Sequence, residues 1–471
     1  MSERGLEPEF PAGVGRQLSS ITGPAVDTDS RIRDLTALPW CSIDNDDSLD
    51  LDQLTACELL DNGAVKILVA VADVDALVKK GSAIDEHARV NTTSVYTSAK
   101  VFPMLPERLS TDLTSLNLGQ DRLAVVTEMI VAADASITEA TVYRATVRNK
   151  AKLDYDAVAA WIDGAGGLPQ AASASPGMDV QLRTQDAVAQ RLRTRRDAEG
   201  SLEFETFQPR AVFEGDRVID IRQQVQNRAR QLIEELMIVT NEHAARFLAS
   251  RGGASLRRVV RSPERWLRIV EVAAKYGESL PREPDSRALG AFLVRRRAAD
   301  SVRFPDLSLA IVKLMGRGEY VVEQPGSAPI GHFGLALRDY THSTAPNRRF
   351  PDLITSRMLK GLLAGTPPAY SLAELEALAQ HCTEQEDAVQ KVERRMRKSE
   401  AALLLQSHVG QQFDAIVTGH SQSDTWVRIF APPVEGKLVG RLRELEVGQR
   451  TRVKLVNANV ERGFIDFVQV D

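Results

Sequence analysis

The chain has 471 residues, of which 43% are apolar, and this length is enough for two or three domains with substantial cores. Its 59 basic and 64 acidic side chains give a net charge of −5, so bulk charge neither favours nor excludes a polyanionic partner. Three widely spaced cysteines without a CxxC pair (Cys41, Cys57 and Cys382) do not suit a disulfide framework or a zinc site, and they favour a reducing compartment.

The first 38 residues are polar and weakly patterned. Pro8, Pro11 and Pro24 discourage long helices there, so we expect an extended arm or short lead-in. The segment lacks the basic and apolar regions of a signal peptide, and no apolar run in the chain is long enough to span a bilayer. We therefore expect a cytoplasmic protein without a membrane partner.

Short β-rich runs follow from about residue 42 to residue 136. Near-continuous apolar runs at 65–71 and 123–131 predict strands that are buried on both faces. Two prolines bracket the apolar residues of 101–106, which predicts a loop or an edge piece there. Beyond them, the small-residue stretch 164–179 predicts a surface loop.

The middle of the chain mixes helical and strand patterns. Apolar residues at three- and four-residue spacing predict amphipathic helices at 181–196, 228–248 and 263–276. A strand-like pair, 201–207 and 210–221 with a turn at 214–216, lies between the first two helices. A long helix is expected from 372 to about 406. This mixed order predicts an α+β or α/β body and not a helical bundle.

The hydrophobic pattern of the chain changes from helical to alternating after residue 409. Five short alternating runs predict five strands, at 412–419, 424–430, 437–439, 449–456 and 463–468. Such strands in about 60 residues suit a small Greek-key barrel of the OB type, a fold often used for single-stranded nucleic acid. We therefore divide the chain into a lead-in (1–38), a main domain (39–408) and a C-terminal barrel (409–471).

The acidic stretch 41–53 carries five aspartates within nine residues. In an alternating segment Asp50 and Asp52 project to one side, with Leu49 and Leu51 anchoring the other. Carboxylates gathered in this way suit a hard divalent cation with oxygen ligands.

Two other interpretations of the acidic stretch are weighed against a metal site. A calcium loop of the EF-hand type, counted from Asp44, is excluded because Leu49 and Thr55 stand where it needs glycine and glutamate. Aspartates that merely cap turns and helix starts remain the open alternative.

Basic side chains gather in separate clusters although the net charge is negative. The clusters lie at 191–196, 257–261, 295–297, 348–349 and 394–398. Several clusters facing one groove would track a phosphate backbone. The alternative is that most of them are solvated helix faces.

The acidic stretch is the first of a series of short motifs spread over about residues 40–400. They lie at 42–52, 70–74, 81–85, 93–96, 103–106, 109–110, 115–117, 121–124, 233–237, 332–337, 340–342 and 344–353. In this order they resemble the catalytic domain of the ribonuclease II and ribonuclease R family. The C-terminal barrel is similar to the RNA-binding domain that closes that family's chains.

The resemblance implies a mixed α/β catalytic domain of the ribonuclease II type followed by an OB-type barrel. It implies a Mg²⁺-dependent enzyme that removes nucleotides processively from the 3′ end of single-stranded RNA and releases nucleoside 5′-monophosphates. Phosphodiester hydrolysis needs an activated water and compensation of the developing charge, which Mg²⁺ held by aspartates supplies. A monomer suffices for this mechanism.

The resemblance also assigns roles at the reacting end. Asp44, Asp50 and Asp52 are the expected catalytic metal shell. Arg348 matches the family's catalytic arginine, and its planar guanidinium suits equatorial phosphate oxygens. Arg349 is expected to contact the RNA backbone or to close an ion pair.

Three further residues are expected to contact RNA or to support the site. Tyr96 matches the tyrosine that packs on the RNA near its 3′ end, and Phe204 is the candidate for a partner ring, with a core role as its alternative. Glu234 is expected to accept a ribose 2′-hydroxyl, with a helix-surface charge as its alternative. His332 and His342 are interpreted as structural, because metal-bound water makes a histidine base unnecessary.

Two departures from the family pattern bear on activity. Gln53 replaces a second consecutive aspartate that ligates metal, so we expect an uncharged metal ligand and weaker cation binding, or compensation by Asp46 and Asp47. The roughly 40 residues before the first motif are too few for one of the family's cold-shock domains, so we expect weaker RNA anchoring and steeper salt dependence. A catalytically weak RNA-binding member is the main alternative, and a metal phosphoesterase for small substrates is a third hypothesis.

Overall fold

The computed structural model describes residues 1–98, 100–205, 209–214, 217–223, 226–301, 303–420, 424–440, 445 and 448–470. Its centre is a seven-stranded mixed sheet in the order β1-β8-β7-β4-β3-β2-β9. The bounds are β1 Arg33–Asp34, β2 Cys41–Asp44, β3 Gln53–Leu59, β4 Val65–Ala72, β7 Asp121–Val131, β8 Ile137–Arg148 and β9 Ala151–Asp154. The inner strands pair antiparallel, whereas β9 pairs parallel with β2 and β1 pairs parallel with β8.

Strands β4 and β7 are the two runs that the sequence predicts to be buried on both faces, and this prediction is confirmed. Along β4, Leu68 and Ala70 enter one hydrophobic core, whereas Val69 and Val71 enter another. Because successive side chains of a strand point to opposite faces, a continuous apolar run fills both cores at once.

Helices cover both faces of the sheet. The first core packs against α1 Ala12–Ser20, α2 Ala83–Asn91 and α10 Phe350–Ala364, and the second against α3 Tyr155–Ile162, α4 Gln170–Ser173 and α5 Met178–Glu199. Helix α6, Arg228–Ser250, contributes Leu236 to the second core and Ala244 to the first. The lead-in is packed onto this body, since Leu6 and Val14 are each 1% exposed.

A helical lobe lies beside the sheet. Helices α7 Trp266–Lys275, α8 Ser286–Ala299 and α9 Phe304–Met315 surround a separate core that contains Phe292 and Ile311. A small ladder, β12 Ser255–Val259 with β13 Glu319–Glu323, connects the lobe to the body. A second ladder, β10 Pro209–Glu214 with β11 Arg217–Gln223, carries Ile221 into the core of the C-terminal barrel.

Two local predictions need correction. Residues 201–205 are not a strand: the backbone N–H of Leu202 donates to the Gly334 carbonyl, and Leu202 and Phe204 pack on the helical lobe. Both strands of the hairpin lie after residue 208, and the predicted turn residues 215–216 and the end of the first run, 206–207, lie outside the described residues. The predicted loop 164–179 contains the one-turn helix α4, which buries Ala172.

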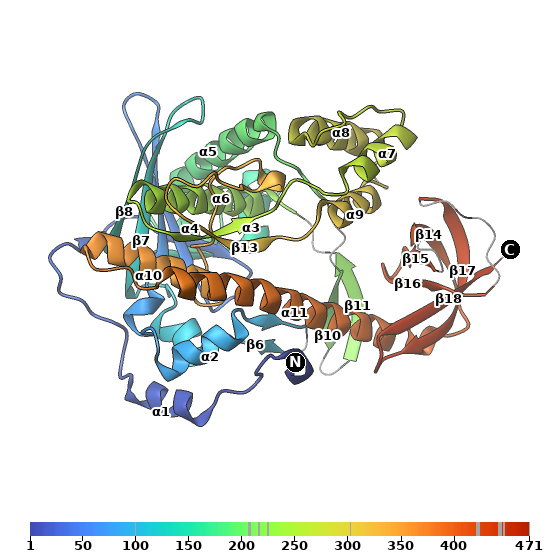
Figure 1. The fold of residues 1–471 in the computed structure, drawn as a ribbon, viewed down its shortest axis with the longest axis horizontal. Helices are drawn as coiled ribbons and strands as arrows, with labels where there is room; N and C mark the ends of the chain where they lie inside the picture. The colour runs from blue at the N-terminus through green and yellow to red at the C-terminus, as the bar shows by residue number, and fades with distance from the viewer. Residues whose placement is uncertain are drawn as a thin grey trace.

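The long predicted helix is confirmed as α11, Leu372–Leu405, which begins with a capping box formed by Ser371 and Glu374. Figure 1 shows α11 crossing the molecule from the sheet domain to the C-terminal barrel. Its last turns carry Ala402 and Leu405 into the barrel core. One continuous helix therefore belongs to both domains.

The five predicted strands of the C-terminal region are confirmed as a closed barrel in the order β14-β15-β16-β18-β17. Their bounds are β14 Gln412–His420, β15 Thr425–Ile429, β16 Glu435–Leu438, β17 Arg450–Asn459 and β18 Phe464–Val470. The α+β fold class is thereby confirmed. Among the described residues, the helices are too short or too polar to cross a membrane.

Candidate active site

The acidic stretch forms a loop between β2, which ends at Asp44, and β3, which begins at Gln53. The predicted alternation fails at Leu49, which is 60% exposed, whereas Leu51 is buried in the first core. The physical reason is a turn at 45–48, closed by the Ser48 N–H on the Asn45 carbonyl (3.1 Å), which breaks the strand.

The loop is held by a neighbouring segment. The Ser115 hydroxyl donates to the Leu49 carbonyl (2.8 Å) and accepts from the Leu51 N–H (3.0 Å). The Leu116 N–H donates to the Leu51 carbonyl (2.9 Å). These bonds fix the backbone on both sides of Asp50.

Asp52 is 2% exposed and is held from the N-terminal end of α10. It accepts the Asn347 backbone N–H at Oδ1 (2.9 Å) and the Arg348 Nε at Oδ2 (3.2 Å). Burial raises the pKa of Asp52 to about 7, although the Arg348 charge acts in the opposite direction. The Arg348 side chain is 42% exposed, so its guanidinium is fixed at one nitrogen and open to a ligand.

Asp44 and Asp50 lie close enough to influence each other electrostatically. Burial, with the nearby Asp50 charge, raises the pKa of Asp44 to about 6. Within the described residues, Asp44 Oδ2 is buried without a hydrogen-bond partner. Asp50 Oδ2 accepts the hydroxyl of Tyr96 (3.2 Å).

The donor set fits a hard cation, although the three aspartates do not gather into one cluster. In the described part of the chain, no three acidic, histidine or cysteine side chains come together as a preformed metal site. Mg²⁺ is usually held by one or two carboxylates with water and phosphate oxygens. The unpartnered oxygen of Asp44, beside Asp50, meets that requirement, and the full metal shell stays a prediction.

Gln53 is the first residue of β3 and stands opposite Val71 of β4. Opposed residues of an antiparallel pair share a face, and Val71 belongs to the second core. Gln53 and Asp52, as successive residues, therefore project to opposite faces of the sheet. A role for Gln53 as a metal ligand stays a prediction, and this geometry places its side chain and that of Asp52 on opposite sides of the strand. Asp46 and Asp47, the proposed compensating residues, are exposed on the turn.

Arg349 differs sharply from its neighbour. Its guanidinium makes a bidentate pair with Asp352, through Nε (2.6 Å) and Nη2 (2.8 Å). The Asp352 side chain is fully buried and also accepts the Ala345 N–H (2.8 Å). Arg349 thus closes an ion pair that fixes the turn carrying Arg348.

The remaining predicted RNA contacts lie in different surroundings. Tyr96 is 42% exposed beside the carboxylates, and burial raises the pKa of its hydroxyl. Phe204 is half-buried against the helical lobe, the surroundings that its core alternative requires. Glu234 is exposed on α6 and accepts the Gln226 amide (2.8 Å). None of these contacts decides a role in RNA binding.

His332 and His342 have structural partners. The His332 Nδ1 accepts the Leu335 N–H (3.1 Å), and the His342 Nδ1 bonds the Tyr320 hydroxyl (2.8 Å). Burial lowers the pKa of His332 to about 4 and holds the pKa of His342 well below its usual range. Both rings are therefore neutral at pH 7.

Sequence reasoning missed a cation on the other side of the acidic loop. Arg230 of α6 donates through Nη2 to Asn45 Oδ1 (2.9 Å), and its guanidinium lies 4.4 Å from the ring centroid of Tyr155. Arg230 and Asn45 are 185 positions apart, and Arg230 lies outside the motif 233–237 of the same helix. Only the fold brings them together.

Two cavities meet at α11. The carboxylate cavity, of about 560 Å³, is lined by the acidic loop, the segment 94–103 and α11. The barrel cavity, of about 600 Å³, lies between α9, α11 and the barrel, and its wall includes Trp426 and Lys398. Arg397 and Glu400 line both cavities.

Most of the basic clusters form ion pairs and do not line these cavities. Arg196 pairs with Glu235, Arg258 with Glu386 and Arg295 with Glu278. The cluster on α11 is the exception among the described residues, because Arg394, Arg397 and Lys398 line the barrel cavity. A phosphate path along α11 is therefore better supported than one along the other clusters.

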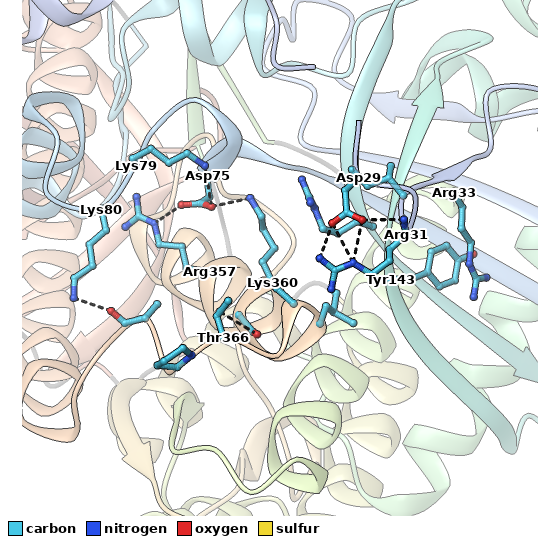
Figure 2. Close-up of a pocket in the computed structure, with 17 residues that line it drawn as sticks. Asp29, Arg31, Arg33, Asp75, Lys79, Lys80, Tyr143, Arg357, Lys360 and Thr366 are labelled. Carbon is cyan, nitrogen blue, oxygen red and sulfur yellow. Dashed lines mark hydrogen bonds and ion pairs between the residues drawn. The ribbon is translucent and has the colours of Figure 1, made fainter. Parts of the chain in front are cut away.

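A third cavity, of about 570 Å³, lies at the opposite end of α10 (Figure 2). Seven basic and two acidic side chains line it, and some of the bases are held in ion pairs: Lys360 bonds Asp73 (2.6 Å) and Asp75 (2.7 Å), and Arg357 bonds Asp75 (3.0 Å). These pairs connect α10 to the segment after β4, η2 Val74–Ala76. We interpret this cavity as a structural junction.

The fold and the site together define a class: a two-domain protein whose α/β domain places an arginine at an acidic loop, followed by an OB-type barrel. The chain belongs to the RNB domain family. The family model described as RNB domain matches residues 32–365, and the model described as RNase II-type exonuclease C-terminal S1 domain matches residues 411–470. The resemblance seen in the motifs is confirmed.

Curated relatives and solved structures agree with this assignment. Ribonuclease R of Vibrio cholerae is 29% identical over 500 residues, which cover 98% of this chain and 60% of the relative. Ribonuclease R of Escherichia coli is 30% identical over 471 residues, which cover 92% of this chain and 57% of the relative. The apo structure of Mycoplasma genitalium RNase R has the same fold, with a TM-score of 0.89 at 23% identity over 100% of this chain and 77% of that one. This chain spans about three fifths of the length of the curated relatives.

Proposed function

We propose that this protein is a Mg²⁺-dependent 3′-to-5′ exoribonuclease that degrades single-stranded RNA processively to nucleoside 5′-monophosphates. Its place in the RNB domain family and its similarity to proteins named ribonuclease R support this function. The observation that carries the proposal is the Asp52–Arg348 pair, which lies close enough to Asp44, Asp50 and Tyr96 to act on them electrostatically. Asp50 and Tyr96 line the carboxylate cavity.

The chain's own side chains suit the chemistry. Mg²⁺, held by Asp44 and Asp50 with Asp52 nearby, would supply charge compensation and an activated water. Asp52 holds the Arg348 guanidinium at one nitrogen, which leaves its other N–H groups to bind phosphate oxygens in a planar fork. The arginine is thus oriented before RNA arrives.

Tyr96 provides a surface for the terminal base. Its hydroxyl bond to Asp50 fixes the ring, and its exposed side is available for stacking, worth roughly 1–3 kcal/mol per base without reading sequence. Phe204, Glu234 and Arg349 remain proposed RNA contacts, and Gln53 a proposed fourth metal ligand.

The remaining assignments belong to the same proposal. We assign residues 39–408 as the catalytic domain, 409–471 as the RNA-binding barrel and 1–38 as a lead-in packed on the catalytic domain. We also infer a monomeric protein, because one chain contains all the residues that the mechanism uses, and a cytoplasmic one, because its three free cysteines suit a reducing compartment. Light scattering of the purified protein tests the monomer.

The decisive experiment uses one single-stranded RNA, labelled at either end, with Mg²⁺. The 5′-labelled RNA is expected to shorten progressively, and the 3′-labelled RNA to release a labelled mononucleotide at once. Asp52→Asn is expected to abolish shortening while RNA binding persists, because the amide keeps the Asn347 contact and loses the charge that holds Arg348.

Two results would overturn the proposal in different ways. Wild-type protein that binds RNA and leaves it intact would identify the catalytically weak binding member that Gln53 suggests. Hydrolysis of nucleotides and other small phosphodiesters, with no dependence of the rate on the length of an RNA substrate, would identify a phosphoesterase for small substrates.

A further inference from the structure

One face of α11 touches the segment that carries Tyr96. Val389, Glu393, Arg397 and Glu400 follow each other at spacings of four, four and three, so they share that face. Val389 packs with Val95, directly before Tyr96, in a small separate core. Arg397 and Glu400 line the carboxylate cavity beside it.

Tyr96 lies in a short hairpin, β5 Val95–Tyr96 with β6 Val101–Phe102, in which Tyr96 pairs with Val101. The base of this Tyr96 hairpin is bonded to the turn that carries Arg348, because the Ser94 N–H (2.9 Å) and the Thr93 hydroxyl (3.0 Å) both donate to the Arg348 carbonyl. The hairpin and the arginine are therefore fixed relative to each other at one end.

The other end of the Tyr96 hairpin is bonded to α11 by two carboxylates. The Tyr96 backbone N–H donates to Glu393 Oε1 (3.1 Å), and the Ser98 hydroxyl donates to Glu400 Oε2 (2.9 Å). A bond to a charged acceptor is about twice as strong as a neutral one. Two such bonds, seven residues apart on one helix, hold both Tyr96 and the turn beyond it.

Glu400 stands where the helix, the hairpin and the barrel meet. It is 7% exposed, and its second oxygen is buried without a hydrogen-bond partner in the described part of the chain. The two residues after it, Ala401 and Ala402, belong to the barrel core. Burial of a carboxylate oxygen without a hydrogen-bond partner costs free energy, so the bond from Ser98 to the other oxygen strongly favours one position of the hairpin.

We propose that Glu400 is a positioning residue, which acts through Ser98 to fix the Tyr96 hairpin relative to the barrel and so sets the Tyr96 ring in the carboxylate cavity. The proposal rests on the proposed function, in which Tyr96 seats the 3′-terminal base. Glu400 itself does not touch the RNA.

The kinetic test compares Glu400→Ala, Ser98→Ala and the double variant on 5′-labelled single-stranded RNA. Each single variant is expected to raise KM about tenfold and to change kcat less than about twofold, since loss of a charge-assisted bond amounts to roughly one factor of ten. The double variant is expected to match the singles, because both remove one interaction. Glu400→Gln keeps an oxygen acceptor for Ser98 and is expected to restore most of the affinity.

A Tyr96→Ala background separates positioning from a general loss of structure. There, Glu400→Ala is expected to add no further rise in KM. If Glu400→Ala raised KM about tenfold again in the Tyr96→Ala background, the proposal would be overturned. The same would follow if the Ser98 and Glu400 double variant raised KM by the product of the two single effects.

Hydrogen exchange of RNA-free protein tests the contact independently of any nuclease activity. Backbone amides of 94–102 are expected to exchange about tenfold faster in Glu400→Ala and in Ser98→Ala than in the wild type. Glu376→Gln, an exposed glutamate on the same helix, is the matched control and is expected to change neither exchange nor KM. Unchanged exchange at 94–102 refutes the positioning role, whereas faster exchange in a protein without nuclease activity refutes only the proposed function.

Discussion

Arg348 and Arg349 are adjacent arginines for which the structure predicts opposite phenotypes. The Arg348 side chain is 42% exposed and makes one bond to the buried Asp52. Because the pKa of Asp52 is already raised to about 7, this carboxylate can take up a proton when the arginine is lost, so Arg348→Ala is expected to lower the free energy of unfolding by only about 1 kcal/mol. Loss of Arg348 removes a donor to the phosphate, and removal of one such donor typically lowers kcat by about 10²–10³. We expect a folded protein with little activity.

Arg349→Ala is expected to act mainly on stability. Breaking a buried ion pair from one side costs about 3–5 kcal/mol, because the other charge stays buried. Asp352 keeps the Ala345 N–H, and the Arg349 side chain is 24% exposed, so the lower end, about 3 kcal/mol, applies. Urea unfolding of both variants gives the stabilities, and the initial rate on 5′-labelled RNA gives the activities.

The contrast between the two variants is the test, and Arg282→Ala, exposed between α7 and α8, is the matched control that should change neither quantity. An Arg349→Ala protein as stable as the wild type but inactive would show that Arg349 binds the RNA directly. An Arg348→Ala protein that unfolds as easily as Arg349→Ala would refute the division of roles.

Two further predictions concern charge. Gln53→Asp is expected to lower the Mg²⁺ concentration for half-maximal activity about tenfold, by adding a charged ligand oxygen; an unchanged requirement would show that the opposite-face geometry keeps residue 53 away from the ion. The pKa of His332 is lowered to about 4 in the folded protein, so the unfolded chain binds more protons below its usual pKa near 6.5. Stability is therefore expected to fall as the pH falls from about 6.5 toward 4, and His332→Gln is expected to lose less stability than the wild type over this range, as measured by urea midpoints at each pH.

The elements that sequence reasoning predicted well are those with a clear period or a clear length. The apolar run of β4, the amphipathic α6, the long α11 and the five alternating barrel runs all fall into this group. Helix α10 was missed because residues 350–359 are all buried, which removes the polar face that reveals a helix. A helix buried all round has no amphipathic signal.

The site was only partly accessible from the sequence. The acidic loop and Arg348 were found because their motifs are compact, whereas the exposure of Leu49 depends on a turn that alternation does not reveal. The bonds from Arg230 to Asn45 and from Ser98 to Glu400 join residues 185 and 302 positions apart. No spacing rule connects such residues, because tertiary packing alone brings them into contact.

The continuity of α11 has a consequence for how this architecture tolerates length changes. In an α-helix each added residue turns everything beyond it by about 100° and moves it about 1.5 Å along the axis. An insertion between Glu393 and Leu405 would therefore rotate the barrel about the helix axis and separate Arg428 of β15 from Asp306 of α9, now 2.9 Å apart. The rotation of the barrel about the helix axis thus depends on the number of residues in one helix. The helix tolerates substitutions, but insertions or deletions of one or two residues would misplace the barrel. A barrel taken from another protein would have to be joined to α11 at a position that gives the same rotation about the helix axis.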